Sequence, residues 1–357
     1  MKIVYALVSS PSDLYLEQAY VSMHSVRVHM PKARITLVTD SISNETFVGV
    51  RKEELKYVDE LIVLSFDSTF SQQQRSRLVK TSLRQNIEGD FIYIDCDTII
   101  CKPFPEISSA PTDIMACPDT HCKNLMNDPY RWLALRDGRK LNWPVEKETT
   151  YFNGGVLYVK DTSVAHEFYR LWNRNLLDSF SKGISMDQPA LAKSNYQMGH
   201  IIGVLGDIWN CQLKHGIRFL KDAVIVHYLT TNVSRRNNEQ LFILNDTKNF
   251  DCIKSCARIP DAIEKVIHDP FLGIAPMTHC FAGDDIYFFQ TQSYAAISAS
   301  TTDYKAGLVS QNERNKEFLQ SDLFFYCLRH FPNLLTMALE RIIQRLGRIK
   351  RFCKSHM

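Results

Sequence analysis

The sequence predicts an α/β protein in which helices flank a Rossmann-like, mostly parallel sheet. Stretches rich in β-branched and aromatic residues alternate with stretches of helical periodicity through the first hundred residues. Such alternation is typical of right-handed crossovers in a doubly wound sheet. With 357 residues, of which 45% are hydrophobic, the chain can bury one large core without disulfide bonds.

The first strand is expected at residues 2–8, where a continuous apolar run is typical of a buried parallel strand. A helix over residues 14–30 follows, because Ser10 or Ser12 can cap its start and Pro31 stops it. Apolar residues at helical spacing form its expected buried stripe: Leu16, Tyr20, Met23 and Val26.

The alternation then continues to a fourth strand that opens at Asp90. The expected elements are a strand at 33–40, a helix at 44–57, a strand at 60–66, a helix at 72–87 and the fourth strand over 91–94. Later elements are expected as strands at 113–118, 151–160, 200–204, 217–220 and 223–228, and as helices at 164–180 and 187–195. Between them, the polar stretch 119–150 is long enough to predict a lid or an acceptor loop.

Residues 1–231 are expected to form one domain, and residues 232–357 a helical extension. Residues 232–320 carry no clear periodicity, whereas 334–353 place apolar residues at helical spacing with no acidic residue after Glu340. Such a basic amphipathic helix can lie in an anionic membrane interface, or it can dock on the protein with its basic face in solvent. Both possibilities stay open.

Composition excludes several classes of partner and location. A net charge of +3 and a pI near 8.2 do not suggest nucleic acid as a partner. No apolar stretch has the 18 or so residues of a membrane span, and the apolar start is cut short at Ser9, which favours a strand over a signal peptide. The ten cysteines lack the spacing of a zinc site and indicate reduced, mostly buried thiols. A cytoplasmic protein is expected.

Two carboxylates end the fourth strand, in the run D-F-I-Y-I-D-C-D. Because side chains alternate along a strand, Asp95 and Asp97 should point to one side and Cys96 to the other. Two such carboxylates repel each other unless a cation lies between them, and hard oxygen ligands favour Mg²⁺ or Mn²⁺. Taken alone, the pattern also fits a strand that ends in an Asp-rich turn.

Four stretches in a fixed order make the first 230 residues resemble a known family. They are Y-A-L-V at 5–8, S-R-L-V-K-T at 76–81 ahead of F-I-Y-I-D-C-D, Y-F-N-G-G-V at 151–156, and M-D-Q at 186–188. The chain resembles the GT-A fold glycosyltransferases, specifically the family 8 group of retaining, metal-dependent enzymes. The resemblance implies transfer of a hexose-type sugar from a UDP-sugar to a hydroxyl of a glycan or glycolipid, with retention.

The resemblance also implies a metal site. Asp95 and Asp97 would bind Mn²⁺, or Mg²⁺, that bridges the donor diphosphate, and Asp95 would also reach the donor's sugar or ribose. The third ligand would be His227 in A-V-I-V-H-Y, for which a buried core histidine is the alternative. His215 is a rival candidate, although it lacks the preceding apolar strand.

Further positions are implied for the rest of the donor. Arg77 would lie over the diphosphate or the sugar, and Lys80 could share that role. Ala6 and Val8 would hold the base, on which Tyr15 could stack. The alternatives are solvated helix charges for the two basic residues and a core-facing position for Tyr15.

The sugar itself would be bound by residues of two other stretches. Gly154 and Gly155 would let the backbone pass close to a ligand, leaving Asn153 free to bind sugar hydroxyls, whereas a plain β-bulge is the alternative. Asp187 and Gln188 would bind the donor sugar, although Asp187 could simply cap a helix. A front-face reaction with Gln188 stabilising the oxocarbenium-like species is favoured, and a double displacement through Asp187 stays open.

One segment departs from the family pattern. After its histidine the family has a Gly and a Lys that clamp the diphosphate, but this chain reads H-Y-L-T-T-N-V-S-R-R, so Arg235 or Arg236 would replace the clamp. A catalytically inactive binding or scaffold protein is therefore the alternative function. A nucleotidyltransferase is disfavoured, because V-S-S-P-S-D-L-Y after the first strand contains neither Gly nor Arg. The basic tail suggests a membrane-linked acceptor, such as a lipid-linked glycan or lipopolysaccharide core, at the inner face of the cytoplasmic membrane.

Overall fold

The computed structural model of the chain describes residues 1–104, 107, 111–128, 130–147, 150–228 and 242–274. The chain divides into two compact units, and the first, residues 1–128 and 137–279, contains the sheet. Outside the described residues lie Arg235, Arg236 and the helix expected at 334–353. The domain boundary expected at 231 falls in the undescribed stretch 229–241, as do the two arginines, and it stays a prediction.

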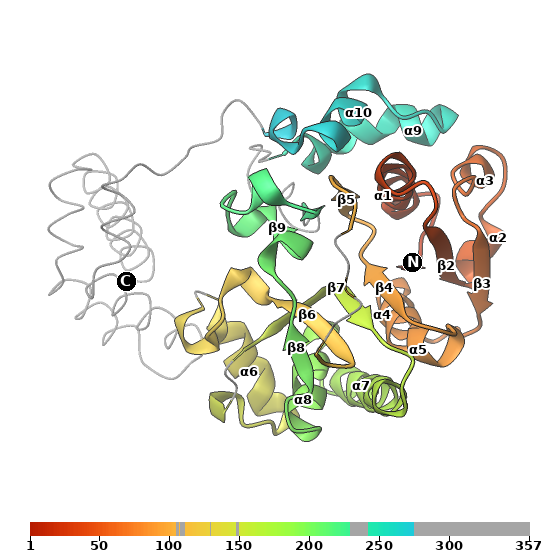
Figure 1. Ribbon diagram of the computed structural model, residues 1–357. Coiled ribbons are helices and arrows are strands. Elements are labelled where there is room, and N and C mark those ends of the chain that lie inside the picture. Colours follow the sequence, from red (N-terminus) through yellow and green to blue (C-terminus); the bar gives the residue numbers. More distant parts are fainter. Residues whose placement is uncertain (105–106, 108–110, 129, 148–149, 229–241, 275–357) are drawn as a thin grey trace, which may run out of the picture. The chain divides into compact units, whose positions relative to one another are not determined.

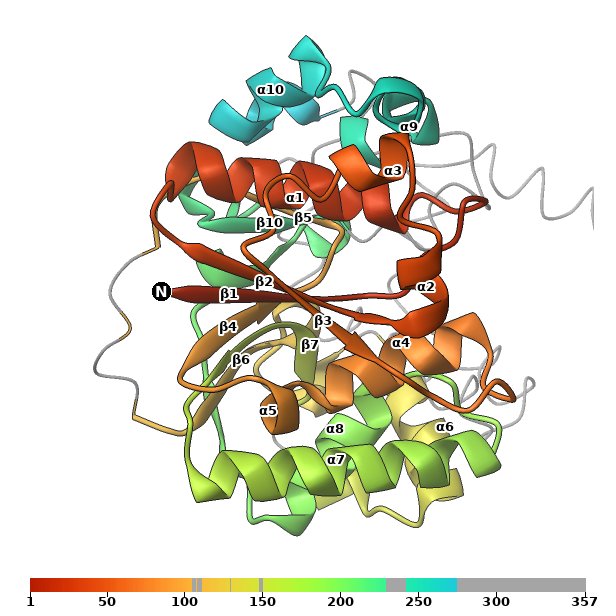
Figure 2. The ribbon, with the colours of Figure 1, turned by 90° about the vertical axis from the view of Figure 1, so that its right-hand side faces the viewer.

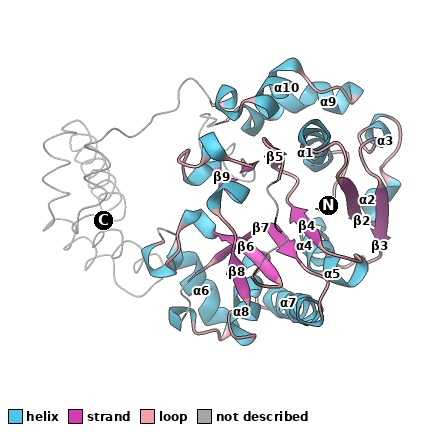
Figure 3. Cartoon of the chain, in the orientation of Figure 1, coloured by secondary structure: helices cyan, strands magenta, loops and turns pink. Residues whose placement is uncertain are grey.

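The first unit is built on a mixed, mostly parallel sheet of seven strands (Figures 1 and 3). The strand order is β3 (Glu60–Leu64), β2 (Arg34–Asp40), β1 (Lys2–Leu7), β4 (Phe91–Ile94), β7 (Phe152–Val159), β6 (Ile114–Pro118) and β8 (Ile202–Val204). Each neighbouring pair is parallel except the two that involve β7, which runs antiparallel to β4 and to β6. The fold class expected for this domain is confirmed.

Helices cover both faces of this sheet (Figure 2). On one face, α1 (Tyr15–His29) buries Leu16, Ala19 and Met23 against β1, β2 and β4. On the other face lie α4 (Gln72–Thr81), α5 (Leu83–Asn86), α7 (Ser163–Ser181) and α8 (Gln188–Gln197). The start of α4 is set by a capping box, in which Ser71 and Gln74 each bond the other's backbone.

A second sheet of three very short strands was not expected from the sequence. Its order is β5 (Thr98–Ile100), β10 (Ile225–His227) and β9 (Cys211–Gln212). It packs with α9 (Asp251–Cys256) and α10 (Asp261–His268) in a third apolar cluster, which includes Ile99, Val226 and Ile263. Because β5 follows directly on Asp97, this sheet determines what lies beside the carboxylates.

Several expected elements differ in the structure. Two short helices, α2 (Ser41–Glu45) and α3 (Val50–Glu53), replace the helix expected at 44–57. Gly49, with φ 56°, has a non-helical backbone and separates them. The helix expected at 72–87 is interrupted at Ser82 and gives α4 and α5. The stretch 119–150, expected as a loop, contains α6 (Arg131–Leu141).

Irregular segments replace one of the expected strands. Residues 217–220 form no strand, and a 3₁₀ turn at Leu220–Asp222 lies there instead. Further 3₁₀ turns are Asp119–His121, Leu125–Asn127, Val145–Lys147, Asp207–Asn210, Leu213–His215, Ile243–Asn245, Thr247–Phe250 and Pro270–Gly273. The seven cysteines among the described residues carry free thiols, but Cys252 and Cys256 are exposed rather than buried. Of the helices within the described residues, none is both long and apolar enough to cross a membrane.

Candidate active site

Asp95, Asp97 and His227 converge beyond the end of β4. One ligand atom from each lies within 4.8 Å of the others. The imidazole Nε2 of His227 is 3.1 Å from Asp97 Oδ1 and 3.9 Å from Asp95 Oδ2. Two carboxylates and an imidazole are a donor set that suits a divalent cation such as Mn²⁺.

Strand pairing explains how residues 130 positions apart meet. β10 runs antiparallel to β5, so that His227 lies opposite Thr98, the residue after Asp97. The backbone N–H of Tyr228 then donates to the Asp97 carbonyl at 3.1 Å. On the other side, the Asp95 N–H donates to the Gly155 carbonyl at 2.8 Å. Because β7 is antiparallel, its first residues lie where β4 ends.

The two carboxylates belong to a turn and not to the strand itself, since β4 ends at Ile94. They nevertheless face the same histidine, as expected. Cys96 turns the other way, and its thiol donates to the carbonyl of Ala6 at 3.7 Å. Burial raises the pKa of this thiol well above its usual range, and the flanking aspartates raise it further.

The structure favours His227 over His215 as the partner of the aspartates. His227 is 2% exposed, and its Nδ1 forms a 3.0 Å hydrogen bond with Asn210 Oδ1 while Nε2 faces the carboxylates. Burial lowers the pKa of His227, but the negative charge of Asp97 and the hydrogen bond to it outweigh burial, so the pKa is raised overall. His215 lies in the turn after β9, where burial lowers its pKa to about 4. It is not part of the acid–histidine group.

A second charged cluster adjoins the first. Lys80 Nζ lies 3.3 Å from Asp95 Oδ1 and 3.0 Å from Asp187 Oδ2, and Arg77 Nε lies 3.2 Å from Asp187 Oδ1. Burial would raise the pKa of Asp187, but Lys80 and Arg77 outweigh it and lower that pKa to about 2. The side chain of Lys80 is only 5% exposed. Neither basic residue is therefore an ordinary solvated helix charge.

Tyr93, on β4, completes the surroundings of Asp95. Its hydroxyl donates to Asp95 Oδ1, and its ring lies 5.0 Å from Lys80 Nζ. Burial, followed by the negative charge of Asp95, raises the pKa of Tyr93 well above its usual range. The hydroxyl thus stays a hydrogen-bond donor to the carboxylate at all ordinary pH values.

The side-chain amide of Asn153, which was expected to be free for sugar hydroxyls, is bonded to other groups of the protein. Its Oδ1 accepts from the Gly155 N–H and from Asn210 Nδ2, each at 2.9 Å. Its Nδ2 donates to Asp119 Oδ1 at 2.8 Å and faces Gln212 Oε1 at 3.5 Å. The side chain is 9% exposed, and its whole hydrogen-bonding capacity is used inside the protein.

The two glycines after Asn153 allow close approach of other side chains. A Cβ on Gly155 would lie 2.4 Å from His227 Cε1, and one on Gly154 would lie 3.3 Å from Lys80 Nζ. Position 155 therefore excludes any side chain as long as the imidazole keeps its place. β7 pairs regularly with β4 from Val156 to Val159, but its pairing with β6 shifts register between Phe152 and Leu157. Both glycines lie in this irregular stretch, so a β-bulge is part of the reason for them.

Asp187 and Gln188 stand at the start of α8. Asp187 makes no capping hydrogen bond with its side chain, so capping does not explain it. The Gln188 amide donates to the Phe152 carbonyl at 3.0 Å, which ties its side chain to the start of β7. Both residues thus lie at the same edge of the sheet as Asn153.

The positions expected to hold the base lie at the end of β1. Ala6 and Val8 are buried, with their side chains in the core between the sheet and α4. Tyr15 opens α1 with 40% of its surface exposed, so it is not core-facing. Between them, the Asp13 carboxylate accepts from Ser9, Ser10, Tyr15 and Gln72 and thereby orders the loop.

The polar residues behind the candidate metal ligands were not predicted from the sequence. Asn210, Asp119 and Gln212 are joined to Asn153, and Gln212 also accepts from the Thr120 N–H at 2.9 Å. No local pattern marks them, because each acts through a partner that is distant in sequence. An Asn directly before a two-residue strand has no distinguishing periodicity.

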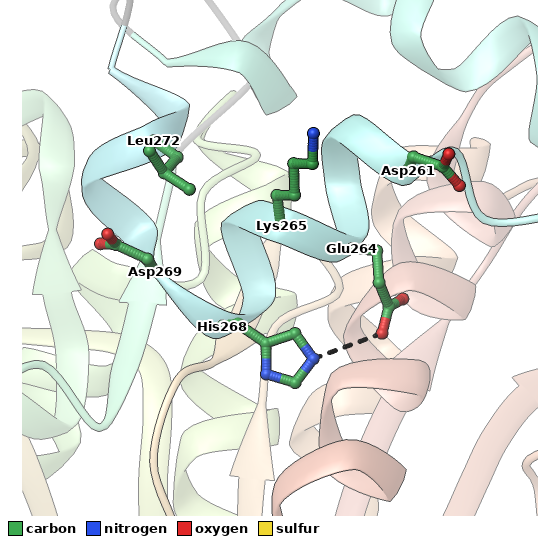
Figure 4. Close-up of a pocket in the computed structure, with 6 residues that line it drawn as sticks. All are labelled: Asp261, Glu264, Lys265, His268, Asp269 and Leu272. Carbon is green, nitrogen blue, oxygen red and sulfur yellow. Dashed lines mark ion pairs between the residues drawn. The ribbon is translucent and has the colours of Figure 1, made fainter.

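A groove of about 390 Å³ lies along α10 and does not belong to this site (Figure 4). It is lined by Asp261, Glu264, Lys265, His268, Asp269 and Leu272. Glu264 Oε1 lies 3.5 Å from His268 and its other oxygen 2.6 Å from His24 of α1. Glu264 thus joins α10 to α1, and none of the expected site residues lines the groove.

Comparison with known proteins shows similarity at the level of structure only. No family model and no curated protein matches the sequence. Similar solved structures include mouse xyloside xylosyltransferase 1, apo form, at 14% identity, covering 63% of this chain and 96% of the other, with a TM-score of 0.42. The galactosyltransferase LgtC, in complex with donor and acceptor sugar analogues, matches at 14% identity, 74% and 99% coverage and a TM-score of 0.46. The glycosyltransferase GlyE of Streptococcus pneumoniae matches at 16% identity, 78% and 66% coverage and a TM-score of 0.45. At these identities the likeness concerns the fold alone.

Proposed function

We propose that the protein is a retaining glycosyltransferase that moves a hexose-type sugar from a UDP-sugar to a glycan or glycolipid hydroxyl, with Mn²⁺ or Mg²⁺ as its cofactor. The observation that carries this proposal is the convergence of Asp95, Asp97 and His227 at one edge of the sheet. Open α/β sheets bind their ligands outside the carboxyl ends of their strands. The motifs that resemble family 8 lie at the same edge.

The donor atoms suit a divalent cation. Asp95 and Asp97 supply hard oxygens, and His227 Nε2 points toward both of them. When bound there, the ion would act as a Lewis acid that stabilises the departing nucleoside diphosphate. His227 Nε2 lies 3.1 Å from Asp97 Oδ1, so one cation would be within reach of both atoms.

The adjoining charges suit an anionic donor. Arg77 and Lys80 face Asp95 and Asp187, so two fixed positive charges lie beside the proposed metal ligands. We assign them the diphosphate, because its negative charge grows as the bond to the sugar breaks. Asp187, with its pKa at about 2, stays ionised and holds both cations in place.

Gln188 is assigned the face of the sugar on which the oxocarbenium-like charge develops. Its amide nitrogen is held by the Phe152 carbonyl, which orients the carboxamide group. A carboxylate that is buried and paired with two cations is a weak nucleophile, and this favours a front-face reaction over a double displacement through Asp187.

The acceptor is inferred from the C-terminal stretch of the sequence. Residues 334–353 have the composition of a basic amphipathic helix, which supports a membrane-linked acceptor and peripheral contact with anionic lipid. Removal of residues 334–357 should release the protein from vesicles of anionic phospholipid. Unchanged sedimentation with such vesicles would contradict the membrane contact.

Hydrolysis of a panel of UDP-sugars, with and without Mn²⁺, tests the proposed activity. We expect Mn²⁺-dependent release of UDP from one or a few donors, and its loss in Asp97→Asn. The matched control is Asp178→Asn, which removes a carboxylate that pairs with Lys182 and Lys193 on the surface. Mn²⁺-dependent binding of UDP without any turnover would instead support the inactive binding protein.

A further inference from the structure

A chain of hydrogen bonds leads from the backbone of β7 to the metal-facing histidine. The Gly155 N–H donates to Asn153 Oδ1, Asn210 Nδ2 donates to the same oxygen, and Asn210 Oδ1 bonds His227 Nδ1 at 3.0 Å. Asn153 Nδ2 donates in turn to the Asp119 carboxylate. Asn153 is 9% exposed, His227 2%, and Asn210 fully buried, so water does not compete for these groups.

The ends of this chain leave one possible orientation for every group between them. A backbone N–H can only donate and a carboxylate can only accept, so Asn153 must turn Oδ1 toward Gly155 and Nδ2 toward Asp119. Asn210 must then offer its NH₂ group to Asn153 Oδ1, which leaves its own Oδ1 for His227. An amide oxygen only accepts, so His227 Nδ1 must carry a proton.

We propose that Asn210, held by Asn153, is a positioning residue that fixes His227 in the tautomer with Nδ1 protonated and presents the Nε2 lone pair to the divalent cation. This inference rests on the proposed function, because it takes the cation to bind between Asp95, Asp97 and His227. A histidine ligand whose second nitrogen is held by a hydrogen-bond acceptor keeps its orientation and binds metal more tightly.

Packing holds the ring from a second side. The imidazole of His227 lies so close to Gly155 that residue 155 has no room for a side chain. A Cβ there would lie 2.8 Å from His227 Nδ1 and 2.4 Å from Cε1. The same residue therefore contacts the imidazole and anchors Asn153 by its N–H. Ring position and tautomer are set by one short piece of β7.

The test is Mn²⁺ binding to the full-length protein without nucleotide. Free Mn²⁺ is counted by electron paramagnetic resonance, and the echo modulation of bound Mn²⁺ reports whether an imidazole nitrogen is a ligand. The variants are Asn210→Ala, which removes the acceptor, and Asn210→Asp, which keeps an acceptor for Nδ1. Asn175→Ala is the matched control, because Asn175 is also buried, at 5% exposed, and donates to Ser194 and Gln197 between α7 and α8.

For Asn210→Ala we expect Mn²⁺ affinity to fall about 10- to 100-fold and the nitrogen modulation to weaken or vanish. Asn210→Asp should keep the nitrogen modulation, and Asn175→Ala should match the wild type in both measurements. If circular dichroism shows that Asn210→Ala is unfolded, the test rests on Asn210→Asp alone. Loss of the nitrogen modulation in Asn210→Asp would then contradict the proposal.

Two negative results have different meanings. If the wild-type protein takes up no Mn²⁺, the proposed metal-dependent function is contradicted together with this inference. If the wild type binds Mn²⁺ through a nitrogen ligand, and Asn210→Ala binds it with equal affinity and equal modulation, only the positioning role of Asn210 is contradicted.

Discussion

Replacing Lys80 by Met should lower the free energy of unfolding and change how that free energy depends on pH. Lys80 Nζ lies 3.0 Å from Asp187 and 3.3 Å from Asp95, and Asp187 is 5% exposed. The fall of the Asp187 pKa from 3.8 to about 2 corresponds to roughly 2–3 kcal/mol, at 1.36 kcal/mol per pH unit. Since Arg77 remains beside Asp187, we expect Lys80→Met to cost about 2 kcal/mol at pH 7, below the usual range for breaking a buried pair.

The sign of the pH dependence follows from the two pKa shifts. The carboxyl of Asp187 has a lower pKa in the folded state, so its stabilising contribution is present above pH 3.8 and is lost as the pH falls toward 2. The pKa of Lys80 is raised: burial lowers it, but Asp187 and Asp95 outweigh that effect, so its contribution is lost only at high pH. The destabilisation should therefore be full at pH 7 and fall to roughly half at pH 3.

Urea unfolding followed by tryptophan fluorescence measures this effect, because Trp172 is fully buried between α7 and α8. Lys193→Met is the matched control: Lys193 pairs at 3.1 Å with Asp178, whose side chain is 37% exposed, and such a pair contributes below about 1 kcal/mol. The reasoning is refuted if Lys80→Met lies within about 0.5 kcal/mol of the wild type at pH 7. A difference equal at pH 3 and pH 7 would also refute it.

Three further substitutions test other parts of the account. Asp97→Asn should lower Mn²⁺ affinity by roughly 100-fold, measured by calorimetric titration, because it removes a charged ligand and leaves the fold intact. Gly155→Ala should lower Mn²⁺ affinity by about 10-fold or more, since its Cβ would displace the His227 ring from its place. Burial and the nearby Glu17 raise the Glu54 pKa to about 8, so the contribution of this carboxyl to stability falls as the pH rises from 4.5 to 8. At 1.36 kcal/mol per pH unit, Glu54→Gln should therefore raise the free energy of unfolding by up to roughly 4 kcal/mol at pH 8, but by only about 1 kcal/mol at pH 5.

Each of these substitutions has a matched control of the same residue type. Asp178→Asn should leave Mn²⁺ affinity unchanged, and Gly154→Ala, whose Cβ meets only Lys80 Nζ below 3.4 Å, should affect it much less than Gly155→Ala. Glu53→Gln changes an exposed carboxylate and should leave stability unchanged at both pH values. Equal effects of the two glycine variants, or of the two glutamate variants, would count against the packing and the burial invoked here.

Sequence patterns predicted the elements whose side chains repeat over many residues. The central strands β1, β2 and β4 and the helices α1 and α7 lie close to where periodicity placed them. The paired acids after β4 were visible because a carboxylate at the end of an apolar run is locally unusual. The basic residues on α4 were linked to them through the family resemblance alone, because no local pattern relates a helix charge to a distant carboxylate.

Short-range patterns could not reveal features that depend on distant partners. β5 and β9 have three and two residues, too few for any periodicity to show. The place of His227 beside Asp97 depends on the pairing of β10 with β5. The orientation of Asn210 depends on Asn153, which is held in turn by the Asp119 carboxylate. The hydrogen bonds of Asn153 were hidden for the same reason, because its four partners come from different parts of the chain.

Anomalous diffraction from crystals soaked with Mn²⁺ and UDP tests the central claim most directly. The account predicts one strong Mn²⁺ peak within about 2.0–2.4 Å of oxygens of Asp95 and Asp97 and of His227 Nε2, with the diphosphate on the side of Lys80 and Arg77. A Mn²⁺ peak elsewhere on the protein, or none between these three side chains at saturating Mn²⁺, would contradict it.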